Sequence, residues 1–229
     1  MFRIKALGLA TSALLLSVGC AGAQAGRAPV RLETPGWSAD SLLTWFESEA
    51  IDPTQRAAGV GMARVLYVLT HPVPASKQDS VADGLERLAL RPNALEAAKM
   101  AAVSYLAVAG ASSVSRPLPT SAARLGRVFR ASRDRGVRTS VLMLSWTLAD
   151  RGGMIPLLRE VATAAPDNTR AQSIDDDSDP AALAIGALSR MGEPGRAVLI
   201  ELHQKKLVRS PRAQVELRMV IERSPAQFN

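Results

Sequence analysis

Helical segments of similar length recur along this chain at intervals near 40 residues. Matching places in successive segments are occupied by Tyr67, Tyr105, Trp146 and Ser189, which follow one another at spacings of 38, 41 and 43 residues. Two helices fit within each interval, and a single hairpin of that size cannot bury its own apolar face. The chain is therefore predicted to fold by stacking such hairpins on one another.

The rest of the sequence agrees with an all-α chain. No stretch alternates apolar and polar residues as a half-buried strand does, and aromatic residues make up only 4% of the chain. The core is therefore expected to consist of Ala, Leu and Val in close-packed helices. Capping residues, prolines and glycines predict ten helices, at about 38–50, 52–69, 76–90, 94–109, 120–133, 135–149, 154–164, 180–191, 195–207 and 211–223.

Part of this pattern resembles HEAT repeats. In residues 181–192 an Ala-rich segment ends at Gly192, and a second helix follows from Gly195 through 197–202. Residues 141–149, then Gly152 and Gly153, then 155–158, repeat the scheme. The resemblance is strongest over 137–202 and extends more weakly over 54–223. It implies an α-solenoid of about five stacked helical hairpins, of the HEAT/armadillo-like kind; a tetratricopeptide-like array is the alternative.

The N-terminal segment has the order of a secretory signal. Arg3 and Lys5 come first, residues 6–18 are mostly apolar, and small residues fill 19–25. The apolar run is too short to span a bilayer as a stable helix. We therefore expect a signal peptide at 1–23, a Pro-containing linker at 24–37, the helical repeat domain at 38–223 and a short tail at 224–229.

Cys20 is the only cysteine of the chain. The stretch from Leu16 to Cys20 resembles a bacterial lipobox, which implies lipidation of Cys20 and stable membrane anchoring by two acyl chains. The competing cleavage, after Ala23 or Ala25, would remove Cys20 with the signal. In either case the mature chain has no disulfide. The predicted location is the bacterial cell envelope, as a periplasmic protein or a membrane-anchored lipoprotein.

One predicted helix carries an arginine at every third position. Guanidinium groups bind carboxylates and phosphates bidentately, so this helix is the best candidate for contact with an anionic partner; a solvated helix face is the ordinary alternative. The net charge of +7 allows such a role without specifying it. The arginines are Arg124, Arg127, Arg130 and Arg133, and a weaker basic cluster follows at Lys205, Lys206, Arg209 and Arg212.

The recurring aromatic residues are a second set of candidates. Tyr67, Tyr105 and Trp146 occupy equivalent positions, so they could line a binding groove, where aromatic anchors concentrate. The alternative is that they belong to the helical core.

An acidic run covers Asp175, Asp176, Asp177 and Asp179. Clustered carboxylates can bind calcium, but the run lacks the glycine and distal glutamate of an EF-hand loop. The pair Asp179-Pro180 also suits a helix start. We predict a capping loop here, and no metal site or cofactor.

The sequence contains no recognisable catalytic motif, and its two histidines, His71 and His203, are far apart. We therefore expect an exported, non-catalytic binding or scaffold module of the cell envelope with a protein partner and no small-molecule substrate. An enzyme or enzyme subunit on a HEAT-like scaffold is the alternative. Nucleic-acid binding through the basic face is a third, which export disfavours.

Overall fold

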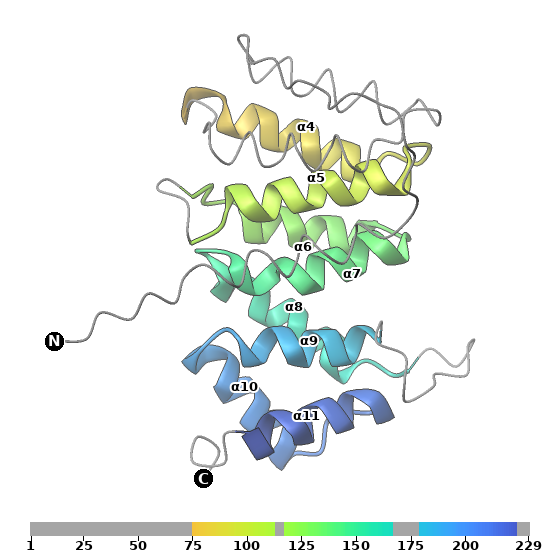
Figure 1. The fold of residues 1–229 in the computed structure, drawn as a ribbon, viewed down its shortest axis with the longest axis vertical. Coiled ribbons are helices and arrows are strands. Elements are labelled where there is room, and N and C mark those ends of the chain that lie inside the picture. Colours follow the sequence, from red (N-terminus) through yellow and green to blue (C-terminus); the bar gives the residue numbers. More distant parts are fainter. Residues whose placement is uncertain (1–74, 113–116, 167–178, 224–229) are drawn as a thin grey trace, which may run out of the picture. The chain divides into compact units, whose positions relative to one another are not determined.

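A computed structural model describes residues 75–112, 117–166 and 179–223. This part of the chain consists of α-helices, labelled as in Figure 1, joined by turns and short 3₁₀ helices. The helices are α4 (Gln78–Leu90), α5 (Glu96–Ala109), α6 (Ser121–Ala131), α7 (Arg135–Leu144), α8 (Ile155–Thr163), α9 (Pro180–Ser189), α10 (Glu193–Gln204) and α11 (Pro211–Arg223). In these residues the only β-type pairing is an isolated bridge between Ala111 and Leu148. The all-α prediction is confirmed for the described part.

The eight described helices pack in two rows. In the odd row, α5 packs on α7, α7 on α9, and α9 on α11. In the even row, α4 packs on α6 and α8 on α10, and α6 reaches α8 through the 3₁₀ helix Arg151–Met154. Contacts between α4 and α5, α6 and α7, and α8 and α9 join the rows. Each of α4 to α10 is thus packed against a sequence neighbour, and α11 is packed against α9.

Neighbouring helices of the odd row run in the same direction. At the start of α5, the Glu96 Oε1 atom accepts a hydrogen bond from the Gly136 N–H of α7 at 3.1 Å, and Lys99 forms an ion pair at 2.7 Å with Asp134 before α7. Beyond the other ends of these helices, Ala111 pairs with Leu148. The starts of successive odd helices therefore lie along one edge, the start edge, and their ends along the opposite edge.

Small side chains let the two rows approach closely around α9. This helix is apolar on nearly all sides, with Ala181, Ala182, Ala184, Ile185, Ala187 and Leu188 buried, as expected for a helix covered by neighbours all round. A Cβ atom on Gly195 of α10 would collide with the Leu188 carbonyl. Glycine at this position therefore lets α10 begin against the end of α9.

The predicted helix boundaries differ from the structure mainly at the end of α7. A single helix was expected from Arg135 to Ala149, but α7 ends at Leu144 and the 3₁₀ helix Ser145–Thr147 follows. The Ser145 and Thr147 hydroxyls donate to carbonyls three residues earlier, at 2.8 and 2.7 Å. Such local bonds compete with helix continuation, and they turn the chain toward its bridge with Ala111.

Several predictions fall outside the described residues. These are the signal peptide, the linker, the first two predicted helices, the tail, Cys20, Tyr67 and the acidic residues 175–177. They remain predictions.

Candidate interaction site

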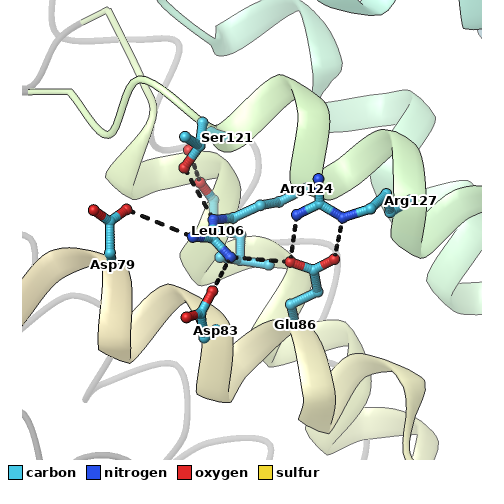
Figure 2. Close-up of polar contacts among 8 residues, drawn as sticks. Asp79, Asp83, Glu86, Leu106, Ser121, Arg124 and Arg127 are labelled. Atoms are coloured by element: carbon cyan, nitrogen blue, oxygen red, sulfur yellow. Dashed lines mark hydrogen bonds and ion pairs between the residues drawn. The ribbon is translucent and has the colours of Figure 1, made fainter.

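Arg124 lies between two helices, where three carboxylates surround it. Its side chain is only 8% exposed. From α6 it contacts Glu86 at 3.0 Å, Asp79 at 3.5 Å and Asp83, all on α4. Figure 2 shows these contacts converging on a single guanidinium group. Burial opposes the charge of Arg124, but hydrogen bonds to Asp83 and Glu86 raise its pKa overall. Arg124 is therefore buried and already paired, not part of a solvated helix face.

The next arginines of α6 also link helices of the even row. Arg127 binds Glu86 through two hydrogen bonds, at 2.6 and 2.8 Å. Arg130 approaches Glu160 of α8 at 3.6 Å, with both side chains exposed. The Arg127 hydrogen bond is the largest cause that lowers the pKa of Glu86 below its ordinary value. Three of the four predicted partner-binding arginines thus contact carboxylates of neighbouring helices. Arg133 is exposed in the turn after α6.

The same kind of contact recurs between α8 and α10. Arg159 binds Glu201 bidentately, at 2.8 and 3.2 Å, and Lys205 contacts Glu201 at 2.9 Å. Hydrogen bonds from Arg159 and then Lys205 lower the pKa of Glu201 to about 2. We call the contacts of Glu86, Glu160 and Glu201 with their basic partners the ion-pair ladder, because they join α4, α6, α8 and α10 in turn.

The aromatic residues occupy different environments despite their equivalent spacing. Tyr105 of α5 is only 6% exposed, so it lies in the core, and burial raises its pKa. Trp146, in the 3₁₀ helix after α7, is half-buried. The Arg190 guanidinium lies over the Trp146 ring, 5.1 Å from its centroid. Of the two described aromatic candidates, only Trp146 is placed where a partner could touch it.

Met143 lies beside this position in sequence. It is 47% exposed and is the one large hydrophobic residue that is exposed in the described part. Met143 precedes Trp146 by three residues, a spacing that places side chains on the same side of a helical turn. Met143, Trp146 and Arg190 together form what we call the Trp146 cluster. Sequence analysis singled out Trp146 but not Met143 or Arg190. The contact between Trp146 and Arg190 spans 44 residues of the chain, so local spacing could not indicate it.

Asp179 caps a helix, as predicted. It is 3% exposed, and its Oδ1 atom accepts a hydrogen bond from the Ala181 N–H in the first turn of α9 at 3.0 Å. Its other oxygen accepts a hydrogen bond from the Ser210 hydroxyl, which also receives the Ala213 N–H at the start of α11 at 3.3 Å. One buried carboxylate therefore connects the starts of two odd helices.

Two further features were sought in the described residues, a metal-binding group and a membrane-spanning helix. No group of three or more His, Cys, Asp or Glu side chains that could hold a metal occurs in this part. Nor does any described helix have the length and apolar character needed to cross a membrane. Comparison of the chain with family models, curated proteins and solved structures found no match. Its function must therefore be inferred from its own residues.

Proposed function

We propose that this protein is an exported, non-catalytic binding module of the bacterial cell envelope, which acts through the surface of an α-solenoid. The parallel odd row and the ladder along the even row support repeated hairpin stacking, since each hairpin contacts the next through equivalent helices. The N-terminal signal pattern and the lipobox-like stretch before Cys20 support export.

The Trp146 cluster is the observation that carries the binding proposal. Trp, Met and Arg are the residues enriched in the centres of protein interfaces. Here an exposed guanidinium after α9 lies over a half-buried indole in the 3₁₀ helix that follows α7, and an exposed thioether precedes the indole by three residues. The expected partner segment has an apolar side chain for Met143 and Trp146 and a carboxylate for Arg190.

Site-specific photocrosslinking tests this assignment. A photoreactive residue replaces Met143 in the producing bacterium, and a matched one replaces Ala197, which is exposed on α10 of the even row. We expect a protein adduct from position 143 only, and its loss when Trp146→Ala and Arg190→Glu are added. Adducts that form equally from both positions, or that survive these substitutions, would contradict the Trp146 cluster as the binding site.

The location is tested by the mass of the mature protein together with membrane fractionation. A diacylated N-terminus at Cys20 in the membrane fraction identifies a lipoprotein, whereas a chain that begins at Gln24 or Gly26 identifies cleavage without an anchor. A chain that retains Met1 in the cytoplasmic fraction would refute export. The enzyme and nucleic-acid alternatives remain predictions that no observation on the described residues favours.

A further inference from the structure

The odd row differs from the even row in charge. Helix α9 contains no charged residue, and neither do α5 after Lys99 and α7 after Arg138. The even row has the charged side chains of the ion-pair ladder at its accessible positions, among them Arg127 and Arg159. The accessible side of a helix at a protein surface is ordinarily polar and charged. An accessible side without charge on three neighbouring helices therefore requires an explanation.

The neighbours of α5, α7 and α9 leave one side of each helix accessible. Met143 is exposed there, and the other residues of this side are half-buried. Residues three or four apart lie on the same side of a helix, so two accessible residues from each helix define a surface. We call this surface the open face, and its residues are Met100 and Ser104 on α5, Thr139 and Met143 on α7, and Leu183 and Gly186 on α9.

Contacts between the helices make the open face continuous. A Cβ atom on Gly136 of α7 would lie 3.0 Å from the Met100 sulfur, so Met100 reaches from α5 to α7. At the other ends of the helices, Arg190 after α9 covers the ring of Trp146 after α7. The Trp146 cluster is therefore one end of a surface that runs across three successive helices of the odd row (Figure 1).

Charged residues border the open face. Glu96 and Arg135 lie at the starts of α5 and α7. On the side of α11, a Cβ atom on Gly186 would lie 3.8 Å from the Glu216 Oε1 atom. Arg190 is at the opposite end, where it contacts Trp146 and the described residues provide no carboxylate for it. A partner that covers the open face must therefore be uncharged at its centre, and it can place a carboxylate beside Arg190.

We infer, on the basis of the proposed function, that the open face binds an amphipathic α-helix of the partner protein. The helices beneath the face bond their own backbone groups, and the Ser104 hydroxyl already donates to the Met100 carbonyl at 2.9 Å. An extended segment buried on this face would leave backbone N–H and C=O groups without partners, which is costly. A helix satisfies its own backbone and needs only an apolar stripe to pack on such a surface.

The dimensions of the row set the length of this partner helix. Helix axes packed 8–10 Å apart place α5 and α9 about 18 Å from each other, which a helix of about 12 residues spans at 1.5 Å per residue. The step from α5 to α7 is then about six residues along a helix, but about three along an extended chain, which rises 3.3 Å per residue. The small residues Ser104 and Gly186 leave room for the partner helix on either side of Met143.

Photocrosslinking from three positions tests the inference. A photoreactive residue replaces Ser104, Met143 or Leu183 of the full chain in the producing bacterium, and Ala123, which is exposed on α6 of the even row, is the control position. Mass spectrometry of the crosslinked peptides identifies the partner residue that each position reaches. We expect adducts to one partner segment from all three positions, at partner residues about six apart for neighbouring helices, and none from Ala123.

The outcomes separate the partner helix from the proposed function. Adducts from Met143 without adducts from Ser104 and Leu183 would overturn the partner helix and leave the Trp146 cluster as the binding site. Partner residues about three apart would indicate an extended segment, and adducts to a second copy of this chain would indicate self-association; either result overturns the inference. The absence of adducts from all three positions would refute the proposed function as well.

A synthetic peptide of the captured segment then allows its affinity for the full chain to be measured. The peptide should become helical by circular dichroism when it binds. Ser104→Glu places an unpaired charge beneath the partner helix, so binding should weaken at least about tenfold, whereas Ala123→Glu adds the same charge to the even row and should leave binding unchanged. Thr139→Glu repeats the test on α7 if Ser104→Glu lowers the Tm. A peptide that binds without becoming helical, or open-face variants that bind as the control does, would contradict the inference.

Discussion

Arg124 and Arg127 sit one helical turn apart and share Glu86, yet they should differ in what they contribute to stability. Arg124 is buried and serves three carboxylates, whereas the Arg127 side chain is 56% exposed. Replacing Arg124 with Met should lower the free energy of unfolding by about 1–3 kcal/mol, since the hydrogen bonds made by a buried guanidinium group are lost. Replacing Arg127 with Met should cost less than about 1 kcal/mol.

Urea unfolding of the two variants measures this difference. Both lose one positive charge from the same helix, so each serves as the control for the other. Equal losses of unfolding free energy in the two variants would contradict the prediction that the buried arginine contributes more to stability than the exposed one. The sequence predicted that both arginines lie on one helix and grouped them by their three-residue spacing. It could not separate them, because the carboxylates that do so lie 38–45 residues earlier in the chain.

Residue spacing was likewise an incomplete guide to the aromatic candidates. Tyr105 lies within α5 and is buried, whereas Trp146 falls beyond the last residue of α7 and is half-buried. The two helices begin 39 residues apart, but α7 ends earlier relative to its start. The Ser145 and Thr147 hydroxyls form local hydrogen bonds where α7 ends. The recurrence of helices along the sequence does not indicate such local bonds.

At the scale of elements, most helices were predictable because their ends carry local signals. Proline begins α9 and α11, and Asp179 and Ser210 precede them as caps. The sequence predicted the Asp179 cap and the helix that begins at Pro211, but not the role of Ser210. It could not predict that the two caps bond to one another, since that contact spans 31 residues.

A double-mutant cycle tests the link between these helix starts. Asp179→Ala should cost about 1–2 kcal/mol of stability, the value of a helix cap. With Ser210→Ala added, the loss of stability in the double variant should be smaller than the sum of the two single losses by about 0.5–3 kcal/mol. The reason is that each single change already removes the bond that the two side chains share. Thermal unfolding of the four proteins gives the coupling. Strict additivity would mean that the caps act separately.

The contact between Arg159 of α8 and Glu201 of α10 should make the stability of the fold depend on pH. The pKa of Glu201 is about 2 in the folded chain, against an ordinary value of 4.5. A carboxylate with a depressed pKa stabilises the fold above its unfolded pKa, and this contribution is lost as the pH falls toward the folded value. Above pH 4.5 we expect the wild type to have a higher Tm than Glu201→Gln. The difference in Tm should shrink as the pH falls from 4.5 to 2. If the difference in Tm stays constant across that pH range, the ion pairs of Glu201 are not what stabilises the wild type.

At the scale of the whole molecule, recurrence near 40 residues predicted paired helices but not which long-range contacts join them. Each of α4 to α10 contacts a sequence neighbour, and α5, α7, α9 and α11 contact one another in turn. If these neighbour contacts supply most of the stability, as in a solenoid, a local loss should spread only to adjacent helices. In a fold with one shared core, the same loss would weaken all the helices together.

Native-state hydrogen exchange of Leu217→Ala separates these cases. Leu217 is 5% exposed on α11, at one end of the described rows, and its truncation should cost about 2–5 kcal/mol. Because α11 packs on α9, amides of α9, α10 and α11 should exchange faster, while those of α4 and α5 keep their wild-type protection. Leu85 is buried in α4, so Leu85→Ala is the matched variant for the opposite end of the described rows and should produce the reverse pattern. Faster exchange throughout in both variants would contradict a solenoid, because distant helices would then share one cooperative unit.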